Sequence, residues 1–273
     1  MFKLFLNKEN IKETTIYSTI EFLAKPDFLC VVGAKLYGTE TEDSDLDIRG
    51  FTFPSPNLIL GLKRWELFEY TAKNTNEDTV IWAVYKFFKM LINGSTIAFE
   101  MLNCPENWII RQSEFAKEII KYKNYFVSTK TITSMLGYAQ SEWRKVLGET
   151  TRNLGAVRKE HIEQTGYSYK NAYHAIRILQ EGIELSKYGF ITFPLANKAF
   201  YIALKTGNIA FRDVECIYKD KLANLEYELK LKREAPKQDN YEFINVLLYR
   251  LNLKHILSNI ITVSPFDKSS FCV

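Results

Sequence analysis

Cysteine and histidine are scarce in this chain, which has four cysteines and three histidines among 273 residues. The cysteines are widely separated and none forms a CxxC pair: Cys30, Cys104, Cys216 and Cys272. Zinc sites and disulfide frameworks both need more closely spaced ligands, so neither is indicated, and we interpret the cysteines as reduced thiols. His161 and His255 have no partner that the sequence identifies, and we interpret both as structural.

Long apolar runs are also missing. No stretch approaches the roughly 20 residues that a membrane-spanning helix needs, and the N-terminal stretch MFKLFLNKENIKETT turns polar too early for a secretory signal. We therefore expect a cytoplasmic protein with no membrane partner. With 47% hydrophobic and 14% aromatic residues, the chain has enough apolar surface to bury a core as one large domain or two modest ones.

The formal net charge of +4 is too small to indicate nucleic-acid binding by itself. Its distribution is uneven, because residues 1–125 carry a small excess of acidic side chains and the remainder carries an excess of basic ones. This division is consistent with metal binding in the first part and anion binding in the second. A chance distribution of charge explains it equally well.

The pattern of apolar residues predicts an α+β fold. FLCVVG at 28–33 and LDIRGFTF at 46–53 are typical of neighbouring strands, and residues 77–95 predict a helix that ends at Asn93-Gly94 or a strand leading into that helix. From residue 112 onward almost every segment has helical spacing. We expect a small mixed-sheet core over 1–111, followed by an all-helical domain over 112–273 and packed against it.

Residues 31–50, VVGAKLYGTETEDSDLDIRG, crowd four acidic side chains between Glu42 and Asp47, behind a turn bounded by Gly33 and Gly38. Asp45 and Asp47 are two residues apart, so on a strand their carboxylates point to the same face. Such a pair can hold one or two Mg²⁺ or Mn²⁺ ions, with the remaining coordination positions left for water and substrate phosphates. A triphosphate is the natural partner. Alternatively, DSDLD is a solvated surface turn, which produces such spacings often.

The order of these parts resembles the polymerase-beta-type nucleotidyltransferases, in which a strand, a glycine turn and a second strand with DxD follow one another. GAKLYGTETEDSDLDIRGF is similar to the GSxLYGTxTxxSDxDxRG signature of the RNA-ligase-associated, RNA-repair-pathway family within that superfamily. Two further blocks, 78–103 and 167–195, also resemble that family. The resemblance extends over roughly residues 28–215 in scattered blocks and implies that 1–111 is a nucleotidyltransferase catalytic core.

The resemblance implies that Asp45 and Asp47 are catalytic metal ligands and that a third carboxylate on a neighbouring strand completes the site. Asp78 occupies the matching position, and Glu69 and Glu77 are the alternatives. In the family's chemistry, two ions stabilise in-line displacement at the α-phosphate. The competing interpretation of Asp78 is an N-cap, because an aspartate just before a helical segment commonly fills that position.

For nucleotide binding, the resemblance points to the glycine turn and its flank. The family usually has serine directly after the first glycine, and here that position is Ala34, which keeps the backbone amide and loses the hydroxyl. Lys35, Thr39 or Ser44 could compensate for the lost contact. The predicted nucleotide-binding residues of this segment are Gly33, Ala34, Lys35, Gly38, Thr39 and Ser44.

A polar stripe runs along the predicted helix near residues 169–188. Lys170, His174, Arg177 and Glu181 recur at helical spacing, with apolar residues on the opposite side. The resemblance favours Lys170, His174 and Arg177 as contacts to the nucleotide or the acceptor, whereas spacing alone fits a solvated face. Glu100 also matches the family, and it could instead pair with a lysine or cap a neighbouring helix.

Residues 141–160 gather basic side chains that suit an RNA backbone, with Trp143 nearby for base stacking. They suit a solvated helix surface equally well, because no base-reading motif accompanies them. The predicted nucleic-acid-binding residues are Arg144, Lys145, Arg152, Arg158 and Lys159.

Together these features predict a metal-dependent nucleotidyltransferase that moves NMP from an NTP to a hydroxyl and releases pyrophosphate. The resemblance makes an RNA end the favoured acceptor, in RNA repair or tRNA modification. Two alternatives stay open. One is NMP transfer to a protein side chain or small molecule, and the other is a noncatalytic module that binds nucleotide or RNA, which Ala34 favours and the aspartates oppose.

Overall fold

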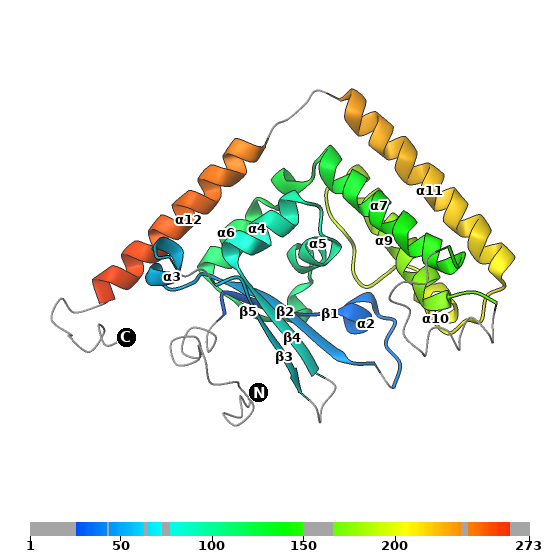
Figure 1. The fold of residues 1–273 in the computed structure, drawn as a ribbon, viewed down its shortest axis with the longest axis horizontal. Helices are drawn as coiled ribbons and strands as arrows, with labels where there is room; N and C mark the ends of the chain where they lie inside the picture. Colours follow the sequence, from blue (N-terminus) through cyan, green and yellow to red (C-terminus); the bar gives the residue numbers. More distant parts are fainter. Residues whose placement is uncertain are drawn as a thin grey trace.

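The computed structural model describes residues 26–42, 44–62, 65–72, 77–149, 166–235 and 240–262. Its centre is a five-stranded sheet in the order β3-β4-β2-β1-β5 (Figure 1). The strands are β1 (Phe28–Val32), β2 (Leu46–Thr52), β3 (Leu67–Ala72), β4 (Glu77–Ala83) and β5 (Ile109–Gln112). Because β2 and β4 run parallel while the other pairs are antiparallel, the predicted mixed sheet is confirmed.

The acidic motif enters the middle of this sheet. The short helix α2 (Gly33–Tyr37) links β1 to β2, and Val32 pairs with Asp47 across these two strands. On the other side of β2, Asp47 is in register with Asp78 of β4. Side chains two residues apart in this segment therefore share a face, as predicted for Asp45 and Asp47. The strand order puts Asp78 beside Asp47.

Residues 77–95 form a strand that leads directly into a helix, α4 (Val84–Ile92). Four apolar side chains on one face of α4 are buried against the sheet: Val84, Phe87, Phe88 and Leu91. Asp78 lies inside β4, and the residue at the N-cap position of α4 is Ala83. The N-cap interpretation of Asp78 is therefore wrong, because β-branched and aromatic residues extend the strand well past it.

The helices lie in two places (Figure 1). On one side of the sheet are α3 (Pro56–Leu60), α5 (Thr96–Leu102) and α6 (Glu114–Lys121); α7 (Thr129–Val146), α9 (Tyr169–Tyr188), α10 (Lys198–Lys205) and α11 (Phe211–Glu234) form a bundle beside them. One continuous hydrophobic core joins sheet and bundle, as expected for two parts packed together. No helix in the described ranges is long and apolar enough to cross a membrane.

The last helix, α12 (Tyr241–Thr262), lies away from the bundle (Figure 1). Phe243 stacks on Tyr125, with ring centroids 4.2 Å apart, and His255 Nε2 lies 3.0 Å from the Pro54 carbonyl oxygen. The predicted domain boundary after residue 111 falls within β5, one residue before that strand ends, and α6 and α12 both pack beside the sheet. His255 makes the structural contacts that the sequence interpretation assigned to it.

Candidate active site

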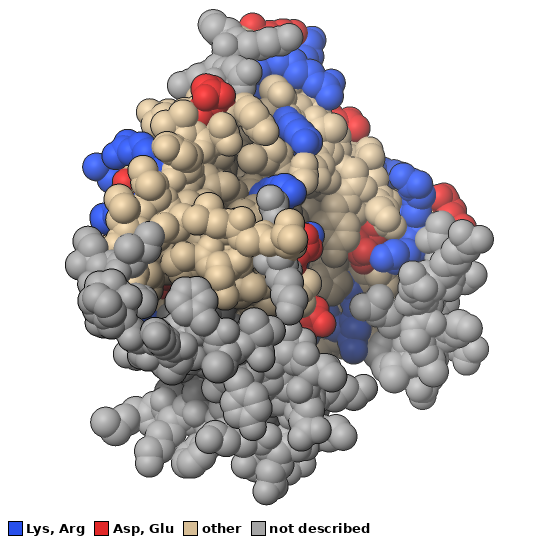
Figure 2. Space-filling model, turned by 60° about the vertical axis from the view of Figure 1, so that its left-hand side comes forward, with Lys and Arg blue, Asp and Glu red and all other residues tan. Residues whose placement is uncertain are grey.

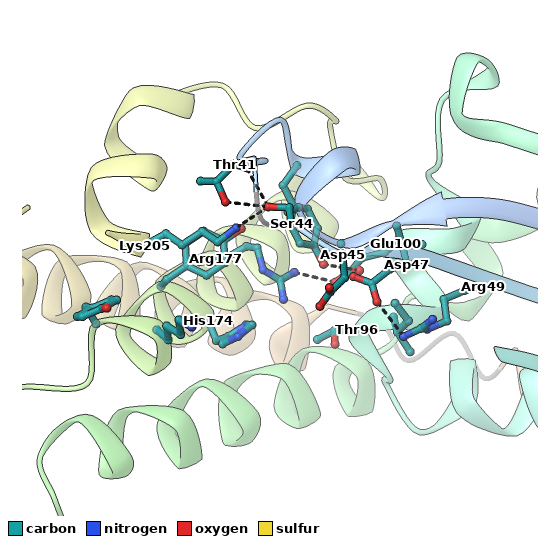
Figure 3. Close-up of a pocket in the computed structure, with 18 of the residues that line it drawn as sticks. Thr41, Ser44, Asp45, Asp47, Arg49, Thr96, Glu100, His174, Arg177 and Lys205 are labelled. Carbon is teal, nitrogen blue, oxygen red and sulfur yellow. Dashed lines mark hydrogen bonds and ion pairs between the residues drawn. The ribbon is translucent and has the colours of Figure 1, made fainter. Parts of the chain in front are cut away.

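A cavity of about 920 Å³ opens between the sheet and the helical bundle (Figure 3). Its walls come from the α2 turn and β2 on one side and from α5, α7, α9 and α10 on the others. This volume lies within the range of small-molecule binding sites, and the position between two packed parts is common for them. Figure 2 shows a hollowed part of the surface with acidic and basic side chains near it.

The paired aspartates lie at one end of the cavity. Asp45 and Asp47 both line it, and so does Arg49, the next residue on the same face of β2 (Figure 3). The Arg49 guanidinium bridges two carboxylates, because its Nη2 lies 3.2 Å from Asp47 Oδ1 and 2.7 Å from Asp78 Oδ2. A cation of the protein itself thus partly neutralises this acidic cluster.

The surroundings of Asp47 disfavour the ionised form of its carboxyl group. Partial burial raises its pKa above the usual value, and the neighbouring charges of Asp78, Asp45 and Glu100 raise it further, while Arg49 acts in the opposite direction. The remaining negative charge makes this end of the cavity favourable for an additional cation.

The predicted third ligand, Asp78, shares the Arg49 guanidinium group with Asp47 and does not face the cavity. Asp78 is absent from the cavity lining, as are Glu69 and Glu77, and Glu77 instead accepts a hydrogen bond from Thr79. Within the described parts of the chain, no group of three His, Cys, Asp or Glu side chains is placed to hold a metal ion. The hard oxygens of Asp45 and Asp47 fit a divalent ion such as Mg²⁺ or Mn²⁺, whereas the three-carboxylate arrangement does not fit this geometry.

Gly33 allows the turn to approach Asp47 closely. Its φ is +69°, and a Cβ built there would lie only 2.3 Å from Asp47 Oδ2. Any side chain at this position would therefore both strain the backbone and displace the carboxylate. This explains why a glycine ends the first strand at the point where the acidic motif folds back.

We expect Gly33→Ala to reduce stability by more than the roughly 1–2 kcal/mol that a left-handed conformation costs an L-residue, and to move Asp47 from its position. Gly148→Ala is a matched control, because Gly148 has φ +70° but open space around it. Urea unfolding of both variants separates backbone strain from the clash. Equal losses in the two variants would contradict the close packing of Gly33 on Asp47.

The predicted nucleotide-binding residues of the turn fall into two groups. Gly33, Ala34 and Ser44 line the cavity, but Lys35, Gly38 and Thr39 do not. Thr39 is buried and its hydroxyl shares a 2.9 Å hydrogen bond with the Tyr173 hydroxyl. Gly38 ends α2 in the left-handed region and packs against Pro194 and Lys198. These two residues shape the turn, so the structure corrects their direct assignment, and that of Lys35, to the nucleotide.

The stripe on α9 points in part at the cavity. Lys170, His174 and Arg177 line it, although Arg177 is buried and its Nη1 lies 2.7 Å from Glu100 Oε1. A second carboxylate, Glu181, also pairs with Arg177. The solvated-face alternative is therefore wrong for Arg177 and Glu181, whose polar groups are buried together. Arg177 thus belongs to a buried ion-pair network that borders the cavity, and its predicted contact to the nucleotide stays a prediction.

Glu100 is the centre of this buried network. It accepts a hydrogen bond from the Tyr37 hydroxyl at 2.6 Å as well as from Arg177, and so connects α2, α5 and α9. Neither pairing with a lysine nor helix capping describes it. The desolvated carboxyl of Glu181 has a pKa raised to about 8 by burial, with Arg177 acting against that shift.

The sequence analysis did not identify several residues of the cavity. Lys205 on α10 donates to the Thr39 carbonyl at 3.2 Å and lies 3.4 Å from Ser44 Oγ (Figure 3). Burial lowers the pKa of Lys205, and the nearby charge of Lys170 lowers it further. Other unpredicted lining residues are Arg49, Thr96, Ile97, Tyr138, Tyr169 and Tyr173. Only Arg49 had a local signal, since it continues the alternation of Asp45 and Asp47.

The predicted RNA contacts lie elsewhere. Arg144 and Lys145 are on α7 outside the cavity lining, and Lys145 pairs with Glu142. Trp143 is buried and stacks on Tyr218 at 3.8 Å, so the expected base stacking by this residue is wrong. The remaining predicted RNA contacts, Arg152, Arg158 and Lys159, lie outside the described residues, and so does His161, which the sequence analysis interpreted as structural.

A mixed sheet with a glycine turn and two aspartates at the start of its central strand is typical of polymerase-beta-type nucleotidyltransferases. Residues 19–245 match the sequence profile of RlaP, described as the RNA repair pathway DNA polymerase beta family. The match covers most of the chain, which therefore belongs to that family. The resemblance seen in the acidic motif is thus confirmed.

Two individual proteins are similar to this chain. One is an uncharacterized 38.9 kDa protein of Enterobacteria phage T4, from the nrdC-mobD intergenic region, 28% identical over 139 residues. The match spans 46% of this chain and about two fifths of that relative. The other is the crystal structure of a nucleotidyltransferase-like protein from Exiguobacterium sibiricum, with 15% identity over 90% of this chain and 89% of that one. Its TM-score is 0.29, too low to inform fold or function.

Proposed function

We propose that this protein transfers NMP from an NTP to a hydroxyl group at an RNA end and releases pyrophosphate. The observation that carries the proposal is a cavity lined by both signs of charge, with Asp45 and Asp47 contributing carboxylates and Lys170 and Lys205 contributing ammonium groups. A triphosphate with its divalent ion needs both. Asp45, Asp47 and Lys205 are labelled in Figure 3. The RNA acceptor rests on the family's description as an RNA repair family.

A Mg²⁺ or Mn²⁺ ion held by Asp45 and Asp47 would neutralise phosphate oxygens and stabilise the charge that develops at the α-phosphate. Lys205 is fixed by the Thr39 carbonyl and Ser44, so its ammonium group is positioned to bind the outer phosphates. In the reaction the acceptor oxygen bonds to the α-phosphorus and the bond to the β-phosphate breaks. The hydroxyl proton passes to a carboxylate or to water, and pyrophosphate leaves.

The aromatic wall of the cavity suits the nucleobase. Tyr138, Tyr169 and Tyr173 line it together with His174, from α7 and α9. Aromatic side chains bind bases by stacking with little dependence on sequence. These aromatic residues are consistent with a nucleoside bound between sheet and bundle. Its triphosphate would then lie along the charged lining residues Asp45, Asp47 and Lys205.

The decisive experiment incubates the protein with each labelled NTP, Mg²⁺ or Mn²⁺, total RNA and total protein. We expect label in RNA. Labelled protein with unlabelled RNA would contradict the acceptor assignment and favour transfer to a side chain. Metal-dependent nucleotide binding without turnover on any acceptor, unchanged in Asp47→Asn, would instead support a noncatalytic binding module, the function that Ala34 favours.

We expect Lys205→Ala to raise the KM for the NTP about ten- to a hundredfold, because a charge-assisted hydrogen bond contributes about 1.5–3 kcal/mol. The rate at saturating NTP should fall much less. Lys230→Ala on α11 is the matched control, since that lysine is exposed and forms only a loose pair with Glu234. An unchanged KM in Lys205→Ala would remove Lys205 from the phosphate site.

A further inference from the structure

Arg49 stands where a polymerase-beta-type site with three carboxylates would hold positive charge. We propose that Arg49 takes the place of a second metal ion, so that the nucleotide-free protein binds one divalent ion at Asp45 and Asp47 while Asp78 is held outside its coordination sphere. The inference rests on the proposed function for the identity of the site. It concerns the number of ions and the role of a residue that the mechanism above does not use.

The topology forces these groups together. Asp47 and Arg49 are two residues apart on β2, and Asp78 is the register partner of Asp47 on the parallel strand β4. Side chains two apart on a strand share a face, and so do register partners on adjacent strands. The guanidinium group therefore reaches both carboxylates without leaving the sheet surface.

Arg49 is fixed in this position by more than ion pairing. Its Nη1 donates to the Asp78 carbonyl at 2.7 Å and to the Ile48 carbonyl at 2.9 Å, while Nη2 serves the two carboxylates. Its side chain is 15% exposed, less than those of Asp47 and Asp78. A guanidinium held by two backbone carbonyls is a permanent part of the site, because displacing it would leave several buried acceptors unpaired.

Arg49 contacts one oxygen of each of two carboxylates. Asp47 Oδ1 and Asp78 Oδ2 face Arg49, whereas Asp47 Oδ2 faces the Gly33 turn. Asp45 and Asp47 line the cavity and Asp78 does not. Three carboxylates and one guanidinium group leave a net negative charge that a single divalent ion balances. This agrees with the cavity, where only two of the carboxylates, those of Asp45 and Asp47, are available as ligands.

The test is the number of Mn²⁺ ions bound per nucleotide-free chain, measured by electron paramagnetic resonance and by calorimetry. We expect one ion in the wild type and in Asp78→Asn, and loss of that ion in Asp45→Asn and Asp47→Asn. In Arg49→Gln, Asp78 loses its contacts to the guanidinium group and a second ion should bind. Arg49→Lys, which keeps the charge, is the matched control and should still bind one.

Two ions in the wild type, no ion at millimolar Mn²⁺, or loss of binding in Asp78→Asn would each overturn the inference. Circular dichroism and thermal unfolding identify an Arg49→Gln protein that fails to fold, and the Asp78→Asn result then decides. Because the readout is ion number without nucleotide, it is independent of turnover. A protein that binds one ion but transfers no NMP would refute the proposed function alone, whereas an active protein with two ions would refute this inference alone.

Discussion

Asp47→Asn is expected to lower the rate of nucleotidyl transfer at least about a thousandfold, because metal-ion stabilisation of a transferring phosphoryl group contributes several kcal/mol. The same change should leave the free energy of unfolding unchanged or higher at neutral pH. Asp47 is partly buried beside other carboxylates, and its pKa is raised accordingly. Its ionised form therefore opposes folding, and a neutral amide of the same shape removes that cost.

The sign of the change in the free energy of unfolding follows from proton linkage. A carboxyl whose pKa is higher in the folded than in the unfolded chain contributes stability at low pH and loses it as the pH rises through the folded value. Single-turnover rates and urea unfolding of Asp47→Asn, with exposed Asp220→Asn on α11 as the control, measure both effects. An active Asp47→Asn protein, or one with strongly reduced stability, would show that Asp47 serves the fold and not the reaction.

Arg177→Met is expected to reduce the free energy of unfolding by about 3–5 kcal/mol, the usual effect of removing one partner from a buried ion pair. The loss is large because Arg177 pairs with two buried carboxylates and its guanidinium lies 4.2 Å from the Tyr37 ring centroid. It is a substantial fraction of the 5–15 kcal/mol that stabilises a typical protein. Urea unfolding at neutral pH measures it.

Glu181→Gln is the matched control for this network. Because burial raises the pKa of Glu181 to about 8, its ionised form is costly in the folded protein, and a glutamine should cost far less than the loss of Arg177. If Glu181→Gln and Arg177→Met lost equal free energies of unfolding, Glu181 would be ionised in the folded protein. The Arg177–Glu181 pair would then stabilise the fold more than the Arg177–Glu100 pair.

The raised pKa of Glu181 predicts that the stability of the protein depends on pH. Folding raises the pKa of Glu181 from 4.5 to about 8, so the folded protein retains a proton that the unfolded chain releases. Its contribution to stability is complete below pH 4.5 and is lost as the pH rises to about 8. The difference between wild type and Glu181→Gln in urea unfolding at pH 5, 6.5 and 8 isolates this contribution, since all other groups are common to both proteins.

The local patterns were enough for two neighbouring strands of the sheet and for the position of the acidic motif, but not for β5 or the strand order. Apolar runs separated by a glycine turn predict β1 and β2, and a spacing of two residues places Asp45 and Asp47 on one face, because backbone geometry alone determines that alternation. Helical spacing put Lys170 and His174 on one stripe but fitted a solvated face equally well; the family resemblance favoured a functional role, and both residues line the cavity. The family resemblance, carried by the same short motif, was confirmed by the profile match over residues 19–245.

Three-dimensional packing determined the rest. The sequence leaves open which charged groups satisfy one another, because such pairs join residues far apart in the chain: Arg49 with Asp78, Arg177 with Glu100, and Lys205 with the carbonyl of Thr39. Burial then decides their roles, since a charge removed from water must be paired. It places Arg177 in a buried ion-pair network at the edge of the cavity, and it brings Lys205, in a helix without a local signal, to the cavity lining.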